Sequence, residues 1–523
     1  MLILLLTTSL AAVAFSSTVP EQLHLSLAGS DPVDGSPTGM KIGWYTNDRP
    51  STLSTVEFGT SPTQLSTSSV STVNQYLAGH GWHHVALMNC TAPSGGSSLI
   101  GNDVYYRVGS GNNNTTWSKV YTFSTSKWKS GTTTTVSMFG DLGYEDSAHR
   151  KATIMEVEPE QFESPISSTT SLRRRQLRPN GLTKEWSATF TREYIEHLKN
   201  RDVLDMVFHA GDIGYADDSF LIDPLHFTYE EVYNGYMNWF QNVTAIMPYM
   251  VSPGNHESEC HSPACVVHHT EYGIPLSNFT AFNARWHMPS AESGGHARSN
   301  MWYSFNFGDV HYVSINSETD FVGAEESTTG DSHMKNLPAG GFGYKGEYMK
   351  WLENDLATAH GLRLAVAAAV AGEDEGEGGG GGGEGGGGGG GGGAAGGRAR
   401  PWIVAVGHRP YGDVVEAAKL FEKYQVDVYV AGHKHSYARS NGGTYGNDTV
   451  YVVAGGAGCD EMKQGAAPHA DDFAGNIAPS SHQVAVTSER YSSGVMTTNA
   501  THLKWELLDS VTGVVLDMFE LNR

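Results

Sequence analysis

Residues 426–435 read VDVYVAGHKH, an apolar run that stops at a glycine and is followed by two histidines. A short continuous apolar run of this kind is typical of a strand that is buried on both faces. Glycine then lets the chain turn sharply at the end of the strand. A histidine pair after a single turn is also common in surface loops, so this stretch alone does not distinguish a metal site from an ordinary turn.

The same pattern recurs at four other places in the chain. TVSMFGD (135–141), DMVFHAGD (205–212), MPYMVSPGN (247–255) and PWIVAVGH (401–408) each reach a glycine and then an oxygen or nitrogen donor. Helical patterns alternate with these runs, as in EWSATFTREYIEHLK (185–199), where apolar side chains recur every four residues. The alternation predicts a layered α/β domain. If the strands form a single open sheet, the donors converge at its carboxyl edge.

The donors at these five strand ends form a candidate metal site. Carboxylates and an amide oxygen are hard ligands, imidazoles suit zinc and iron, and no cysteine belongs to the set. Seven ligands are too many for one zinc ion and fit two metals that share a carboxylate. A tyrosine ligand has to be a phenolate, which requires a strongly Lewis-acidic cation such as ferric iron. The candidate metal ligands are Asp141, Asp212, Tyr215, Asn255, His408, His433 and His435.

In chain order, the blocks GDLG, GDIGYAD, GNHE, GHRP and GHKH resemble the five motif blocks of the purple acid phosphatases, a branch of the dinuclear metallophosphoesterases. The resemblance implies a ferric ion on Asp141, Tyr215 and His435. It implies a divalent zinc, manganese or iron ion on Asn255, His408 and His433, with Asp212 bridging the two ions. It further implies hydrolysis of phosphate monoesters in acid, with a metal-bound hydroxide as the nucleophile.

His256 follows the candidate ligand Asn255, and we interpret it as a phosphate contact and general acid. Large, plant-like members of the family carry additional phosphate-facing histidines between the last two blocks, whereas residues 409–432 contain none. This departure leaves the protonation of the leaving group and the substrate preference open. On the five motif blocks, an acid phosphatase is the preferred interpretation. A related metallophosphoesterase that cuts phosphodiesters or nucleotide pyrophosphates, and a non-catalytic metal-binding glycoprotein, remain as alternatives.

The chain divides into two expected domains, an architecture of the α+β/α/β class. Short β-rich runs between Gly, Ser, Thr and Pro clusters predict a β-sandwich over residues 19–126, which resembles the fibronectin-III-like domain of that family. The layered α/β metallophosphoesterase domain is expected over residues 131–523. Within it, residues 372–397 form a glycine-rich, disordered insert, and residues 447–523 form a β-rich C-terminal region.

The chain carries features of the secretory pathway. Residues 1–17 are an apolar run followed by small residues, which predicts a signal peptide and a secreted protein, either extracellular or vacuolar. Four cysteines allow two disulfides, and Cys260 and Cys265 are close enough to close a small loop. Seven N-x-S/T triplets are candidate glycosylation sites: Asn89, Asn113, Asn114, Asn242, Asn278, Asn447 and Asn499.

The charge of the chain restricts its partners. A formal net charge of −23 disfavours nucleic acid and anionic membranes as partners, because phosphate groups would be repelled over most of the surface. We therefore expect small-molecule phosphate esters as the partners, drawn to the local positive charge of the metals. Self-association into a homodimer is left open.

Overall fold

A computed structural model describes residues 19–91, 97–111, 116–144, 187–221, 226–294, 300–320, 341–343, 346–374, 400–440, 449–462 and 484–523. The expected signal peptide, most of the glycine-rich insert, and the glycosylation candidates Asn113, Asn114 and Asn447 lie outside these residues. Within the described ranges, none of the helices has the length and apolar character needed to cross a membrane.

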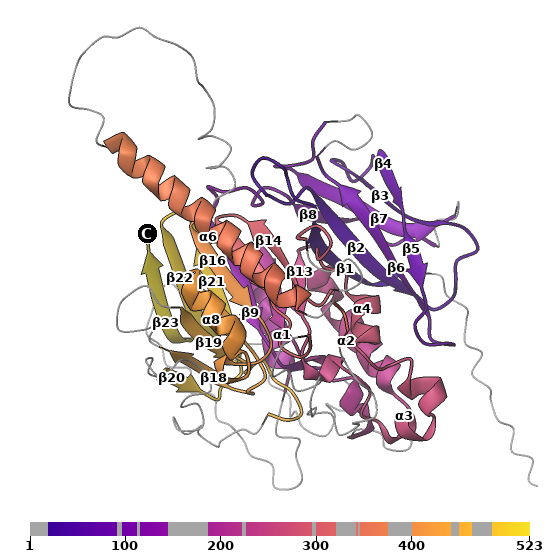
Figure 1. Ribbon diagram of the computed structural model, residues 1–523. Helices are drawn as coiled ribbons and strands as arrows, with labels where there is room; N and C mark the ends of the chain where they lie inside the picture. Colours follow the sequence, from indigo (N-terminus) through magenta and orange to yellow (C-terminus); the bar gives the residue numbers. More distant parts are fainter. Residues whose placement is uncertain are drawn as a thin grey trace, which may run out of the picture.

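The N-terminal part of the chain is a sandwich of two four-stranded antiparallel sheets, seen at the upper right of Figure 1. One sheet has the order β1 (Glu21–Ala28), β2 (Gly39–Thr46), β6 (Trp82–Asn89), β5 (Thr72–Asn74). The other has the order β4 (Thr67–Val70), β3 (Ser54–Gly59), β7 (Asp103–Ser110), β8 (Tyr121–Ser124). Alternate residues of β3 are buried, as expected for strands with one face on a core.

The part of the chain after the sandwich contains two large mixed sheets. The first has the order β13 (Tyr249–Ser252), β11 (Met206–Ala210), β9 (Thr134–Phe139), β21 (Ser492–Thr498), β22 (His502–Asp509), β23 (Val515–Asn522). The second has the order β14 (Tyr303–Phe307), β15 (Val310–Ser314), β16 (Trp402–Val406), β17 (Val428–Ala431), β19 (Val450–Ala454), β18 (Tyr437–Ser440), β20 (Val484–Ser488). A two-stranded ribbon pairs β10 (Leu142–Gly143) with β12 (Ile213–Gly214).

The two large sheets pack against each other through aromatic side chains. Phe208 of β11 lies 6.4 Å from Tyr303, 6.2 Å from Phe305 and 6.3 Å from Tyr312, measured between ring centroids. Because each sheet has its inner face on the other sheet and its outer face under helices, β11, β13, β16 and β17 are buried throughout.

Helices cover both outer faces. On the first sheet, α1 (Thr189–Asn200) and α2 (Tyr229–Thr244) pack, with Tyr236 of α2 hydrogen-bonded to Tyr249 of β13 at 2.9 Å. On the second sheet, α6 (Glu347–Asp374) and α8 (Val415–Lys423) pack, as Figure 1 shows. The remaining helices in the described part of the chain are short: η4 (Asp217–Leu221), η5 (Asn255–Glu257), α3 (Pro263–Val267), η6 (His269–Gly273), α4 (Thr280–Arg285) and η7 (Tyr411–Asp413).

The expectation of a single sheet is wrong. The strands β9, β11 and β13 run parallel in the first sheet, whereas β16 and β17 run parallel in the second. The two sets of strand ends still meet, because a backbone hydrogen bond of 2.9 Å links Gly140 N after β9 to Ala454 O of β19. The candidate ligands therefore come from two packed sheets with a shared edge.

The C-terminal region and the insert also differ in detail from the expectation. The strands β21 to β23 extend the first large sheet, with β21 pairing antiparallel to β9, so the C-terminal region is part of the core of the α/β domain. Helix α6 continues to Asp374, so the first three residues of the expected glycine-rich insert are helical. Figure 1 shows α6 projecting beyond the sheet that it covers.

Candidate dinuclear metal centre

All seven candidate ligands lie at the shared edge of the two large sheets. The loops after β9, β11 and β13 supply carboxylate, phenol and amide groups, and the loops after β16 and β17 supply the histidines. Two groups of residues have ligand atoms that all lie within 4.8 Å of one another. The groups are Asp212, His408 and His433, and Asp141, Asp212 and His435.

In the first group, an amide and a carboxylate face two imidazoles. The Nε2 atom of His408 lies 3.0 Å from Asp212 Oδ2 and 3.0 Å from Asn255 Oδ1. The Nδ1 atom of His433 also lies 3.0 Å from Asn255 Oδ1. The other nitrogen of His408, Nδ1, lies 2.9 Å from the carbonyl of Ala210, which orients the ring with Nε2 toward the cluster.

The second group surrounds a phenol. The hydroxyl of Tyr215 lies 3.4 Å from Asp141 Oδ1, 3.4 Å from Asp212 Oδ2 and 3.3 Å from His435 Nε2. Asp212 belongs to both groups, and its Oδ2 atom contacts both His408 and Tyr215. One carboxylate is therefore placed to connect two neighbouring cation sites.

The backbone at these positions is strained. Asp141, Asp212, Tyr215 and His433 have φ angles of 63°, 58°, 55° and 67°, in the left-handed region that residues other than glycine rarely adopt. Each such residue costs on the order of 1–3 kcal/mol, and residues of this kind cluster at functional sites. At this edge the chain thus accepts a cost in stability at four residues, and in return their side chains point toward one another. This is typical of a functional site.

Two glycines leave the space that the acidic side chains occupy. A Cβ atom on Gly254 would lie 2.2 Å from Asp212 Oδ1, and one on Gly432 would lie 2.5 Å from Asp141 Oδ2. Both distances are far below van der Waals contact. Glycine is therefore required before Asn255 and before His433 because the neighbouring carboxylate fills the place of a side chain.

Glu257, the last residue of the GNHE block, holds two of the loops together. Its carboxylate accepts hydrogen bonds from the backbone N–H groups of Asp212 at 2.9 Å, Ile213 at 2.8 Å and Gly254 at 2.7 Å. One buried side chain thus joins the loop after β11 to the loop after β13. This residue stabilises the positions of the candidate ligands Asp212 and Asn255.

The electrostatics of the site fit a pair of cations. Burial would raise the pKa of Asp212, but the imidazoles of His408 and His256 hold it well below its usual range. Against the lowering effect of burial, the Asp212 carboxylate raises the pKa of His408 to about 9. Burial raises the pKa of Tyr215 well above 10. Without metal ions, a proton on His408 therefore balances the negative charge of Asp212. Metal ions bind such ligands by replacing their protons, so this site is suited to cations.

His256 lies beside this cluster and is oriented by a carboxylate. Its Nδ1 atom lies 2.8 Å from Asp217 Oδ2, and its ring lies 4.2 Å from that of Tyr215 between centroids. Its Nε2 atom faces the cluster, 4.0 Å from Asp212 Oδ2 and 3.6 Å from Glu461 Oε2. The ring thus presents one nitrogen to the candidate metal centre and the other to Asp217.

A sixth strand end, which the sequence analysis missed, also contributes to the site. Strand β19 is parallel to β17, and the sequence after it reads GGAGCDE at 455–461. Cys459 is fully buried and lies near enough to His435 and Tyr215 to raise the pKa of both, and Glu461 Oε2 lies 3.6 Å from His435 Nε2. Among the described residues, the compact groups of ligand atoms do not include Cys459, so it lies beside the candidate ligands without joining them. An apolar run ending in glycine is present here, but Cys459 and Glu461 lie five and seven residues beyond the strand rather than directly after its first glycine.

Arg409 is a second residue that the sequence analysis missed. It is 2% exposed, donates from Nε to Glu318 Oε2 at 2.8 Å, and places Nη1 at 3.3 Å from His433 Nε2. Burial, followed by the charge of Arg409, lowers the pKa of His433 well below its usual value. His433 is therefore neutral, the form in which imidazole binds a metal.

Other residues singled out from the sequence have structural or surface positions. His209 is buried and hydrogen-bonded to Tyr249 at 2.8 Å, whereas His268 and His269 are exposed. Cys260 and Cys265 form a disulfide, and Cys90 is a free, buried thiol. Of the described glycosylation candidates, Asn89 and Asn242 are exposed, and Asn278 and Asn499 are partly buried.

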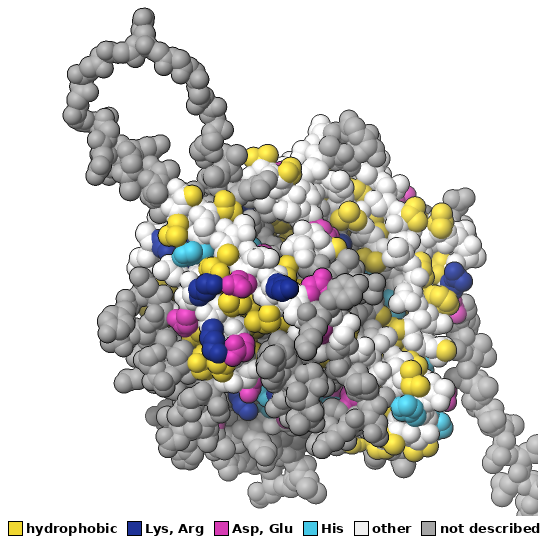
Figure 2. All heavy atoms as spheres, viewed as in Figure 1, with side chains coloured by type: hydrophobic (Ala, Val, Ile, Leu, Met, Phe, Trp, Pro, Cys, Tyr) yellow, Lys and Arg dark blue, Asp and Glu magenta, His cyan; other side chains and the backbone are white. Residues whose placement is uncertain are grey.

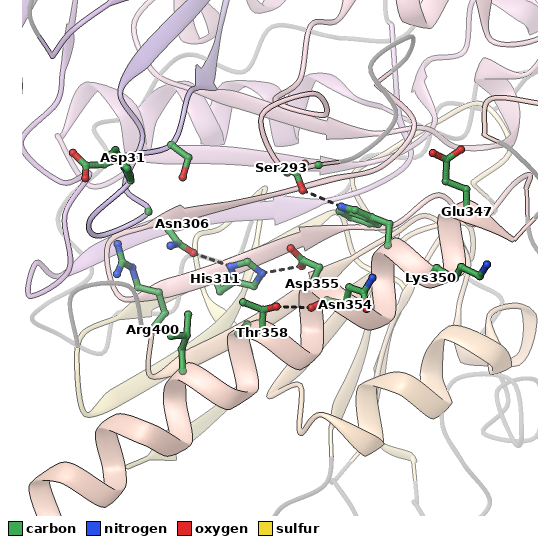
Figure 3. A pocket seen from close by; sticks show the side chains of 17 residues that line it. Asp31, Ser293, Asn306, His311, Glu347, Lys350, Asn354, Asp355, Thr358 and Arg400 are labelled. Atoms are coloured by element: carbon green, nitrogen blue, oxygen red, sulfur yellow. Dashed lines mark hydrogen bonds and ion pairs between the residues drawn. The ribbon is translucent and has the colours of Figure 1, made fainter. Parts of the chain in front are cut away.

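A cavity of about 860 Å³ lies away from these ligands, between the N-terminal sandwich and α6 (Figure 3). His311 at its wall is hydrogen-bonded to Asn306 at 2.8 Å and to Asp355 at 2.9 Å. Asp31 and Arg400 line it as well, and none of the seven candidate ligands does.

On the face shown in Figure 2, described basic and acidic side chains are interspersed over the α6 and α8 region.

Three family descriptions match the chain over most of its length. "Purple acid Phosphatase, N-terminal domain" matches residues 20–125, "Calcineurin-like phosphoesterase" matches residues 138–363, and "Iron/zinc purple acid phosphatase-like protein C" matches residues 448–518. The N-terminal match coincides with the sandwich, and the second covers the loops after β9, β11 and β13. The third covers strand β19, most of the C-terminal strands and the segment that carries Cys459.

Curated relatives with similar sequences are phosphatases. Acid phosphatase A of Cryphonectria parasitica is 26% identical over 97% of this chain and 92% of its own length. Acid phosphatase of Aspergillus ficuum is 27% identical over 56% of this chain and 52% of its own length. Probable purple acid phosphatase 20 of Arabidopsis thaliana is 27% identical over 49% and 44%, so the chain spans about half of these last two relatives.

Solved structures share the fold. A purple acid phosphatase from yellow lupin (Lupinus luteus) seeds aligns with a TM-score of 0.59 at 16% identity, covering 97% of this chain and 74% of that one. The structure of PhoD aligns with a TM-score of 0.53 at 14% identity, covering 98% and 90%. At these identities the likeness concerns the fold alone.

The fold, the paired donor groups and the sequence matches together define an acid phosphatase of the dinuclear metallophosphoesterase class. Within that class, the chain belongs to the purple acid phosphatases. The expected sandwich and α/β metallophosphoesterase architecture is confirmed.

Proposed function

We propose that this phosphatase hydrolyses phosphate monoesters of small molecules with one ferric ion and one divalent ion, either zinc, manganese or iron. The observation that carries this proposal is the pair of donor groups that share Asp212, because the Tyr215 phenol lies beside Asp141 and His435 of the second group. That group, Asp141, Tyr215 and His435, would hold the ferric ion. Asn255, His408 and His433 would hold the divalent ion, with Asp212 as the bridge.

When bound, the two cations would attract the phosphate oxygens and lower the pKa of coordinated water, so that hydroxide is available in acid. The chain itself supplies His256 for contact with the phosphate and protonation of the leaving group. Although burial opposes it, the carboxylates of Asp217 and Asp212 raise the pKa of His256 well above its usual value. The imidazolium form required of a general acid is therefore the one present at acid pH.

A second candidate is hydrolysis of phosphodiesters or nucleotide pyrophosphates. It is favoured by the segment after His408, which contains no histidine up to residue 432 and instead contributes the buried Arg409. A guanidinium binds phosphate oxygens but does not donate a proton to a leaving group, since its pKa is above 12. Leaving groups that need little protonation would then be preferred.

We also propose that the protein enters the secretory pathway and is glycosylated. The disulfide between Cys260 and Cys265 supports this location, because such bonds persist in oxidising compartments. The exposed Asn89 and Asn242 are the candidates best placed for glycan attachment. Sequencing of the secreted chain should place its N-terminus near Ser16 or Ser17, whereas an intact Met1 would contradict the signal peptide.

Metal analysis and a substrate panel test the proposed reaction. The purified protein should contain iron and a second metal, absorb visible light through a phenolate-to-iron transition, and cleave monoesters faster than diesters. Tyr215→Phe should abolish the absorption band. Tyr312→Phe is a matched control, because Tyr312 is also fully buried but lies in β15, outside the candidate centre. A colourless, iron-free active enzyme would contradict the ferric assignment, and faster cleavage of diesters would favour the second candidate.

A further inference from the structure

His256 and three other side chains form a cluster on the side of His256 that faces away from the candidate dinuclear centre. Nδ1 of His256 and Nδ1 of His261 each lie 2.8 Å from the same atom, Asp217 Oδ2. Asp218 places Oδ2 at 3.8 Å from His256 Nδ1 and Oδ1 at 3.5 Å from His261 Nδ1. Ligand atoms of these four residues all lie within 4.8 Å of one another, the same compactness found in the two groups of the dinuclear centre.

Buried carboxylate oxygens that no described residue pairs accompany this cluster. Asp217 is fully buried, and its second oxygen, Oδ1, has no hydrogen-bond partner among the described residues. Glu259 is 1% exposed, and within the same described ranges neither of its carboxylate oxygens has a hydrogen-bond partner. The charges of His261 and Asp217 act on the Glu259 carboxyl, so Glu259 lies near the cluster. Carboxylates buried in this way are costly unless a cation or a proton compensates them.

Carboxyl groups outnumber imidazoles around the cluster. Besides Asp217, Asp218 and Glu259, the partly buried Asp460 acts on His256, and the half-exposed Glu461 contacts its Nε2 atom. Burial raises the pKa of Glu259 to about 7 and that of Asp460 to about 6. Two imidazoles face five carboxyl groups here, so the enclosure attracts a positively charged ligand.

The chain holds the cluster on braced segments. Asp217 and Asp218 begin η4, and His256 lies in η5. His261 lies inside the loop that the buried disulfide Cys260–Cys265 closes. The disulfide limits the movement of His261, so the distances between the four ligand atoms do not depend on a flexible loop.

We propose that Asp217, Asp218, His256 and His261 form a third cation site, which binds zinc or a similar divalent transition ion. Two imidazoles and two carboxylates are a donor set suited to zinc and unlike the all-oxygen sets of calcium and magnesium. A cation there would replace the proton on His256 Nδ1, fix the ring, and leave the N–H group at Nε2 directed at the dinuclear centre. This orienting role rests on the function proposed above, whereas binding of the ion does not.

Calorimetric titration of the metal-loaded enzyme with zinc chloride tests this site. The wild-type enzyme should bind one further zinc ion per chain, and zinc counted by mass spectrometry after equilibrium dialysis should rise by the same amount. Asp218→Asn and His261→Gln should each weaken this binding at least tenfold, and the double variant should abolish it. His268→Gln is the matched control, because His268 is an exposed histidine seven residues from His261.

Two outcomes would overturn the proposal: no uptake of zinc beyond the dinuclear centre, or undiminished uptake by the double variant. Thermal unfolding establishes that each variant is folded, and the nearly isosteric Asp218→Asn change suffices if His261→Gln disturbs the loop. A parallel titration of Asp212→Asn separates this proposal from the proposed function. Loss of metal from the dinuclear centre in that variant, with the additional zinc ion retained, would show that the two sites are independent.

Discussion

Gly254→Ala is a sensitive test of the metal centre, because it adds one methyl group directly beside the proposed bridging carboxylate. Gly254 has φ −112° and ψ −173°, an extended conformation that alanine adopts without strain. The effect of the change is therefore one of space alone. The new Cβ atom would lie 2.2 Å from Asp212 Oδ1 and 2.6 Å from the backbone nitrogen of Asp212.

Relief of this overlap requires Asp212 to move by about 1 Å, since ordinary contact begins near 3.4 Å. A displacement of about 1 Å at a reacting centre can reduce the rate roughly 100-fold. Overpacking of a buried position also costs about 1–3 kcal/mol of unfolding free energy. We expect kcat for p-nitrophenyl phosphate to fall about 100-fold and the metal content to fall below two ions per chain.

Gly361→Ala is the matched control, because Gly361 lies in α6 and a Cβ atom there would meet nothing within 4 Å. This control should retain wild-type kcat and gain up to about 1 kcal/mol of stability, since alanine favours the helix. Metal analysis, kinetics and thermal unfolding on the three proteins distinguish the effects. Wild-type kcat and full metal content in Gly254→Ala would refute the bridging position of Asp212.

Three further predictions concern the proton donor, acid stability and the insert. His256→Ala should slow esters with poor leaving groups more than activated aryl phosphates, and equal slowing of both classes would exclude an acid role. Burial lowers the pKa of His84 to about 4, so its contribution to stability is complete above pH 6.5 and is lost as the pH falls toward 4. Between pH 7 and pH 4.5 this loss amounts to about 2–3 kcal/mol, and denaturant unfolding should show a correspondingly smaller pH dependence in His84→Gln. Deletion of residues 375–397 should leave the secreted yield and kcat nearly unchanged, because a longer loop at this position costs little stability; a collapse of the yield would show that the segment is needed.

Much of the candidate site could be predicted from local sequence. A strand buried on both faces is a continuous apolar run, and the turn after it needs glycine where a neighbouring carboxylate fills the space of a side chain, as at Gly254 and Gly432. These requirements lie within a few consecutive residues. The block after β19 escaped the same reasoning because its first two glycines serve close packing, and Cys459 and Glu461 follow only beyond a third.

Cys459 shows what local sequence does not reveal. Its thiol lies near enough to His435 and Tyr215 to raise the pKa of both, yet nothing near it in the sequence links it to the GHKH block or to the GDIGYAD block. This proximity arises because β19 lies beside β17 in the second sheet and its loop pairs Gly458 with Leu142 of β10. Contacts of this kind depend on strand order, which local pattern does not specify.

The amino-acid sequence by itself determined which residues end buried strands and which donors follow them, because burial, turn geometry and ligand chemistry act over a few neighbouring residues. Only the tertiary structure decided that these strands belong to two packed sheets, since β9 pairs with β21, whose residues are more than 350 positions away along the chain. The tertiary structure also placed His261 within hydrogen-bonding distance of the Asp217 carboxylate that contacts His256. Hydrogen bonding between distant strands and packing of their faces set these distances, and both depend on the whole chain.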